Sequence, residues 1–154
     1  KALPGTYKIQ LSKNGKPVSE QNFNLLKDPR SSATTEDLQS QFNFIIEIQG
    51  KLTEIHKTLK NITKIREQIN LLKASITDKE KNKEIVELAD KIVKEMTIIE
   101  NELYQTKSKS SQDPLNFPIK LNNKLAHLNS LSSIGDYKPT DQSVEFKKEI
   151  DDFI

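Results

Sequence analysis

At 154 residues the chain has the length of one ordinary domain, and its apolar fraction of 34% lies below the globular average of about 45–50%. Its 24 basic and 22 acidic residues nearly cancel, which argues against long disorder and against a basic face for nucleic acid. The absence of cysteine excludes disulfides and thiolate zinc sites, and no uncharged run approaches the ~20 residues that span a bilayer.

The first thirty residues have the period of β-structure. Tyr7, Ile9 and Leu11 alternate with polar residues over 6–11, and residues 18–26 form the returning strand. Asn14-Gly15 between them is the strongest short hairpin signal in the chain. A lone hairpin is marginal in water, so it either packs on the helices or belongs to a sheet upstream. We favour the second and assign residues 1–30 to the end of an immunoglobulin-like sandwich.

Residues 35–76 predict one helix of about 60 Å at ~1.5 Å per residue. Its apolar residues recur seven apart in two rows: Ile48, Ile55, Ile62, Ile69 and Ile76, and Ile45, Leu52 and Leu59. Thr34 or Thr35 can cap the helix, with acidic Glu36 and Asp37 in its first turn. Such a seam needs other helices along it, supplied by the same chain or by a second copy.

Two positions interrupt this seam. Gly50 weakens the helix, and we expect it to permit close approach of another helix. Arg66 stands where the period predicts an apolar residue. A buried ion pair is one explanation, and an arginine that snorkels at the helix edge is the one we favour.

A second helix is predicted over residues 83–106, antiparallel to the first because the connection is short. Its apolar stripe is Ile85, Leu88, Ile92, Met96, Ile99 and Leu103, with Val86, Ala89 and Val93 on one flank. We expect this stripe to match the apolar seam of the first helix.

A third helix is expected from Pro118, capped by Asn116, to near Gly135. A short fourth helix after Pro139 contains Val144, Phe146, Ile150 and Phe153. The predicted fold is therefore mainly α: an antiparallel bundle of three long helices plus a short fourth, over residues 31–154, preceded by the β-hairpin.

Few residues suggest chemistry. His56 and His127 are the only imidazoles, and no phosphate-binding glycine loop, nucleophile elbow or zinc-binding histidine pair is present. Carboxylates are plentiful, but pairs on the surface of a slender bundle provide no cleft for acid–base work. We expect no catalytic residue, cofactor or metal site in this chain.

The connection over residues 107–117 is the least bundle-like stretch. The candidate contact residues are Lys107, Lys109, Gln112, Asp113 and Asn116. The structural alternative is a well-capped turn that packs Leu115 and Phe117 into the end of the bundle.

Two sets of motifs, one around this connection and one in the first thirty residues, carry a family resemblance. Tyr104-Gln105-Thr106-Lys107, followed by the run from Gln112 through Asp113-Pro114-Leu115-Asn116-Phe117-Pro118 to Leu125, resembles the C-terminal region of large secreted β-propeller proteins of Bacteroidetes-type bacteria. Those proteins have sortilin-like, BNR-type repeats and are commonly labelled glycosyl hydrolases. Pro4-Gly5-Thr6-Tyr7, Asn14-Gly15-Lys16 and Lys27-Asp28-Pro29-Arg30 resemble the last sandwich strands of the same family.

The resemblance implies a non-catalytic C-terminal accessory or interaction domain of an exported protein. Its partners would be the upstream propeller and sandwich domains, or another protein, with an extracytoplasmic location. No catalytic residue transfers to this chain, because the family's aspartate-box repeats do not occur in it. The alternative is a glycan- or substrate-contacting part of a carbohydrate-active hydrolase, with Tyr104 and Tyr137 as its exposed aromatic rings.

Overall fold

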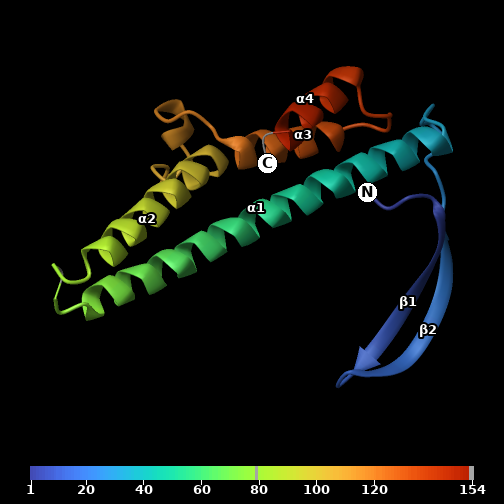
Figure 1. Ribbon diagram of the computed structural model, residues 1–154. Coiled ribbons are helices and arrows are strands. Elements are labelled where there is room, and N and C mark those ends of the chain that lie inside the picture. The colour runs from blue at the N-terminus through green and yellow to red at the C-terminus, as the bar shows by residue number, and fades with distance from the viewer. Residues whose placement is uncertain (79, 153–154) are drawn as a thin grey trace.

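The computed structural model describes residues 1–78 and 80–152 and shows a hairpin followed by helices (Figure 1). The elements are β1 (Gly5–Lys13), β2 (Lys16–Leu25), α1 (Thr35–Ser75), α2 (Lys83–Leu103), the 3-10 turn η1 (Asp113–Leu115), α3 (Leu121–Ser132) and α4 (Asp141–Asp151). The predicted mainly-α fold with an N-terminal β-hairpin is confirmed. Helices α3 and α4 have 12 and 11 residues, so two long helices carry two short ones.

The hairpin closes through Asn14 and Gly15, as predicted. Their φ angles of 52° and 75° are the left-handed values that a two-residue type I′ turn requires. The strands pair antiparallel, and the rings of Tyr7 and Phe23 stack across them at 5.9 Å. The register shifts between Leu11 and Ser12, near the turn. The hairpin of β1 and β2 joins the helices at the start of α1 and extends away from them (Figure 1).

Helix α1 begins with a reciprocal cap. The Thr34 hydroxyl accepts a hydrogen bond from the Asp37 N–H at 3.1 Å, and the Asp37 carboxylate accepts one from the Thr34 N–H at 3.0 Å. The helix continues for 41 residues, about 62 Å at ~1.5 Å per residue. A Cβ added at Gly50 would have no described atom within 4 Å. The prediction that Gly50 admits a neighbouring helix is therefore wrong.

The core lies where α3 packs along the N-terminal half of α1. Ile48 and Leu125 have no exposed surface, and Ile55 is 1% exposed. The core cluster is Phe44, Ile48, Ile55, Leu103, Leu121, Leu125, Leu128 and Ile150. The predicted seam of α1 is thus confirmed in this half, which we call the proximal half.

Helix α4 packs mainly on α3 and reaches the proximal half of α1 through an ion pair. Lys147 of α4 binds Glu47 of α1 at 3.1 Å and Asp151 of its own helix at 2.6 Å. Burial by itself lowers the pKa of Lys147, but its hydrogen bonds to Asp151 and Glu47 outweigh that effect and raise the pKa above its usual value. Ile150 adds a buried apolar contact. Phe153, predicted to belong to this helix, lies outside the described residues.

Helix α2 runs antiparallel to the C-terminal half of α1, the distal half, and buries only part of the predicted stripe. Leu103 is buried and Met96 half-buried, whereas Ile85, Leu88, Ile92 and Ile99 are exposed. The predicted flank is better covered, since Ala89 is buried and Val86 and Val93 are half-buried. Helix α2 also ends at Leu103, three residues before the predicted end.

Arg66 joins α1 to α2 in an ion pair with Glu100, with its Nη2 2.6 Å from the Glu100 Oε2 and both side chains mostly buried. Arg66 Nη1 donates to the Glu100 Oε1 at 3.4 Å, and the Thr97 hydroxyl accepts a further hydrogen bond from Arg66 at 3.5 Å. The partner lies 34 residues away, so the sequence pattern did not show it. The ion pair, and not the favoured snorkelling arginine, is what the structure contains.

The connection before α3 also differs from its prediction. Asn116 follows η1, and Lys120 is the residue before α3, so the expected cap at Asn116 and first turn at Pro118 are wrong. Leu115 is exposed and Phe117 half-buried, so only Phe117 packs as expected. Lys120 has extended backbone, with φ −111° and ψ −180°, so the helix begins only at Leu121.

The chain exposes far more surface than a compact domain. Its accessible area is 11719 Å², against about 7,900 Å² for a compact monomer of 17.6 kDa. The projecting hairpin, whose strand β2 is exposed throughout, and the two-helix distal half both contribute to this excess of about 3,800 Å². These two regions are therefore the places to look for binding.

Candidate interaction surfaces

The predicted contact loop, residues 107–117, is held together from within by Asp113. Its carboxylate accepts hydrogen bonds from the backbone N–H groups of Lys109 and Ser110 and from the Ser110 hydroxyl, the last two at 2.8 Å. The two backbone N–H groups and then the hydroxyl hold the pKa of Asp113 below its usual value. Asp113 is thus a structural residue of the loop rather than an outward contact.

The remaining candidate residues of the loop reach the surface. Lys107, Lys109, Gln112 and Asn116 are all exposed. The ammonium group of Lys107 lies 6.0 Å from the centroid of the Phe117 ring, at the outer limit of a cation–π contact. Beneath the loop is a hollow of about 330 Å³, lined among others by Tyr104, Phe117 and Asn123. The loop therefore offers polar side chains beside a small partly aromatic hollow.

The described residues contain no cluster of histidine and acidic side chains that suggests catalysis or metal binding. His56 and His127 are both exposed and lie on different helices. Residues 1–78 and 80–152 contain no group of three or more histidine, aspartate or glutamate side chains placed to hold a metal ion. None of the helices in this part of the chain combines the length and apolarity needed to cross a membrane.

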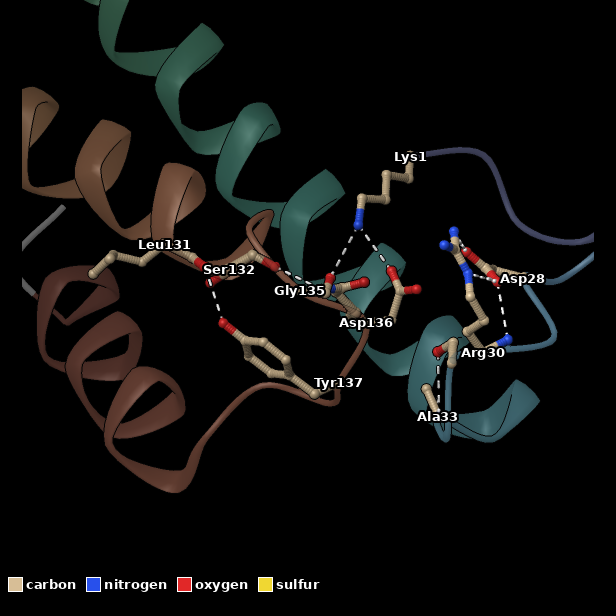
Figure 2. Close-up of polar contacts among 11 residues, drawn as sticks. Lys1, Asp28, Arg30, Ala33, Leu131, Ser132, Gly135, Asp136 and Tyr137 are labelled. Atoms are coloured by element: carbon tan, nitrogen blue, oxygen red, sulfur yellow. Dashed lines mark hydrogen bonds and ion pairs between the residues drawn. The ribbon is translucent and has the colours of Figure 1, made fainter.

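The first residues of the chain are fastened to the loop between α3 and α4 (Figure 2). The Lys1 ammonium donates to the Gly135 carbonyl at 3.2 Å and to the Asp136 carboxylate at 2.8 Å. The hydrogen bond from Lys1 lowers the pKa of Asp136. The buried Gln41 amide of α1 donates to the carbonyls of Ser132 and Gly135, both at 2.8 Å.

The hollow at this junction measures only about 180 Å³ and is lined by the start of the chain, the exit from β2 and the first turns of α1. That is less than the ~300 Å³ at which small-molecule sites begin. Figure 2 shows Asp28 and Arg30 paired beside it, and their Nη2–Oδ2 distance is 2.8 Å. The junction thus fixes where the hairpin leaves the helices.

The hairpin has one apolar and one polar face. The apolar residues, which we call the hairpin face, are Tyr7, Ile9, Leu11, Phe23 and Leu25. Ile9 and Leu11 are 62% and 64% exposed. On the opposite face Lys8 pairs with Glu20 at 2.8 Å, and the Thr6 hydroxyl donates to the Asn24 side chain at 2.9 Å. On one face the polar side chains therefore pair with each other, while on the other face apolar side chains are exposed to solvent.

A second apolar surface lies along α1 and α2 in the distal half. Its members, which we call the distal face, are Ile65, Leu72, Ile85, Leu88, Ile92 and Ile99, and each is at least 40% exposed. A hollow of about 360 Å³ continues this face toward α3. Periodicity alone does not identify this surface, but its signal is present in the sequence, because α2 carries apolar residues on more of its circumference than one neighbouring helix can cover.

These features define a helical scaffold with two exposed apolar faces, at its hairpin and at its distal end. Comparison with known proteins adds no relative to it: no family model, curated protein or solved structure matches the chain. The resemblance to the secreted propeller proteins stays a prediction from the sequence motifs.

Proposed function

We propose that this chain is a non-catalytic interaction module whose hairpin completes a β-sheet layer in a neighbouring domain. The observation that carries this proposal is the exposed hairpin face, set on a well-formed hairpin with a polar opposite face. Sandwich sheets bury alternate residues of each strand against a second sheet about 10 Å away. Ile9, Leu11 and Phe23 alternate with polar residues as such a layer requires. Within the described chain no second sheet covers them, and all three are exposed.

The partner follows from the chemistry of this face. Most of its side chains are aliphatic or aromatic, Gln21 and Ser19 opposite Ile9 and Leu11 are polar, and none is charged, so the matching surface is a mainly apolar sheet face rather than a polyanion. The motif resemblance points to a sandwich domain of the same exported polypeptide, with a propeller beyond it, as that surface. The helices would then be its C-terminal accessory, outside the cell's cytoplasm.

The first test measures the native protein. Its intact mass shows whether further domains are attached, and hydrogen exchange compares residues 5–25 in the native protein and in the 154-residue chain. We expect exchange in the native protein to be slower by about tenfold or more, because a covered sheet opens less often. A native protein of the same mass whose hairpin exchanges at the same rate would refute the proposal.

Matched variants locate the contact within the hairpin. Ile9→Lys places a charge on the hairpin face, while Gln10→Lys places the same charge on the opposite face of the same strand. We expect the first to abolish the slow exchange of residues 5–25 in the native protein and the second to preserve it. Equal effects of both variants would show that the apolar face is not the contact.

A second candidate, contact with a glycan, rests on the hollow beneath the loop, where Tyr104 and Phe117 lie beside exposed polar side chains. Aromatic rings and amide or lysine groups are a combination that holds sugars. Replacing Lys107, Lys109 and Gln112 with alanine removes exposed side chains and should leave the helical circular dichroism unchanged. Undiminished oligosaccharide binding and undiminished partner binding in this variant would contradict any role of the loop.

A further inference from the structure

We infer that the distal face binds a second copy of this chain, forming an antiparallel four-helix bundle from two α1–α2 pairs. The proposal is independent of the hairpin and of any sheet that covers it. It starts from the difference between the two flanks of α2: one flank packs on α1, and the other leaves Ile85, Leu88, Ile92 and Ile99 exposed.

One face of α1 runs from the proximal half, where α4 contacts it, into the distal half. Glu47, Glu54, Ile65 and Leu72 are separated by 7, 11 and 7 residues, close to whole numbers of turns, so they share one face of α1. Helix α4 binds that face at Glu47. The distal hollow reaches it at Glu54. Beyond Glu54 the same face continues through Ile65 and Leu72, both exposed.

Helix α4 also marks where the open surface ends. Glu102 of α2 lines a hollow shared with α4 residues Phe146 and Ile150, and it also lines the distal hollow with Ile98 and Ile99. The distal face therefore lies in the layer that α4 occupies, starting where α4 stops. From Ile99 to Ile85 it extends 14 residues, about 21 Å at ~1.5 Å per residue.

This geometry favours a second copy over other occupants. A face made of two antiparallel helices is half of a four-helix bundle, and its natural complement is another two-helix layer. A second copy placed in the same direction would collide with α4, whereas one turned end for end fits with its tip against α4. The arrangement is isologous and closes on itself, so it makes a dimer and not a filament.

The exposed area is sufficient for such an interface. A standard interface removes about 800 Å² from each partner. The chain's excess over a compact monomer is about 3,800 Å² on the area scaling, so a dimer contact and a covered hairpin can both be accommodated. Six aliphatic side chains in two rows also give the apolar centre that a stable interface requires.

The mass in solution tests the dimer directly. Sedimentation equilibrium at micromolar concentrations should give twice the chain mass of 17.6 kDa. Ile92→Glu, in the middle of the face, should raise the dimer dissociation constant by about 100-fold or more, as loss of an interface hot spot does. Leu71→Glu on exposed α1 surface outside the face is the matched control and should leave the mass unchanged. Circular dichroism confirms that both variants keep their helices.

Single cysteines test the orientation, because the chain has none of its own. In the antiparallel dimer the two copies of Ile92 lie near the two-fold axis, so Ile92→Cys should form a disulfide-linked dimer on mild oxidation. The two copies of Ile85 lie about 21 Å apart by the helical rise, beyond the ~7 Å limit for a disulfide, so Ile85→Cys should not. Mixing Ile85→Cys with Ile99→Cys should restore cross-linking.

Three outcomes would overturn the proposal. The first is a monomer at every concentration up to about 100 μM, where a contact of micromolar affinity would be saturated. The second is a dimer that survives Ile92→Glu but is lost with Ile9→Lys, which would assign self-association to the hairpin. The third is efficient cross-linking of Ile85→Cys to itself, which would show a parallel pair.

Discussion

The proximal and distal halves of α1 carry the same seven-residue apolar pattern but are covered to different extents. In the proximal half α3 packs along the pattern, where Ile48 and Ile55 are fully buried, and α4 adds an ion pair at Glu47 on the next side. In the distal half α2 covers the pattern, where Ile62 is buried, but Ile65 and Leu72 on the next side stay exposed. A heptad pattern therefore predicts that a helix will be packed, while the number of neighbours decides how much of its circumference is buried. The predictions below measure that difference.

The largest effect is expected in the proximal core. Leu125→Ala removes a side chain with no exposed surface and should lower the free energy of unfolding by about 2–5 kcal/mol. Leu71→Ala, the same change on the exposed side of α1, should cost less than about 1 kcal/mol. Urea unfolding at one fixed protein concentration measures both. Similar losses for the two variants would show that the core does not lie at α3.

The ion pair of the distal half should contribute less. Glu100→Gln leaves the half-buried Arg66 guanidinium without its carboxylate and should lower the free energy of unfolding by about 1–2 kcal/mol, below the range for fully buried pairs. Glu20→Gln in the exposed Lys8–Glu20 pair is the control and should change little. A double-mutant cycle with Arg66→Met isolates the coupling, and a coupling near zero would contradict the role given to this pair.

Gly50 offers a stabilising change in the long helix. Gly50→Ala should raise the free energy of unfolding by about 0.5–1 kcal/mol, because alanine loses less backbone entropy and its Cβ meets no described atom within 4 Å. Gly15→Ala should have the opposite sign, since Gly15 has a φ of 75° that strains any side chain. Thermal unfolding reports both signs, and destabilisation by Gly50→Ala would indicate an unseen neighbour of α1.

The smallest effect is a loss of stability in acid. Hydrogen bonds lower the pKa values of Asp28, Asp37, Asp113 and Asp136 in the folded chain. The folded state therefore binds fewer protons than the unfolded state, whose aspartates titrate near about 3.9. This contribution is complete above that pH and decreases as the pH falls through 3.9 toward the lower folded values. Asp37→Asn should flatten the decrease, and an unchanged slope would contradict the cap.

Local sequence signals predicted most of the fold. The Asn14-Gly15 turn, the Thr34 cap and the apolar rows of α1 depend on residues close together in the chain, and each is present in the structure. Some errors are local, such as the helix start expected at Pro118, but others concern contacts between distant residues. Arg66 finds Glu100 from another helix, and Gly50 faces open space that only the positions of the other helices define.

Only one of the two exposed apolar faces was predictable from the sequence. Alternation in β1 indicated an uncovered apolar face, because two strands are too few to bury it. The distal face was not foreseen, since the rows of α2 are equally apolar on two adjacent flanks and periodicity does not say which one meets α1. The loop of residues 107–117 was singled out by its composition, yet its Asp113 serves the loop's own hydrogen bonds.

The unbroken length of α1 has a consequence for how the two faces could work together. The hairpin leaves at its N-terminal end, and the distal face lies along its C-terminal half (Figure 1). Two chains whose distal halves overlap end for end would hold their hairpins at opposite ends of a stiff rod. Such a rod would fix the spacing of the two domains whose sheets the hairpins complete. Any surface that both domains contact would then be bound bivalently, far more tightly than by one domain alone, but only where its sites match that spacing.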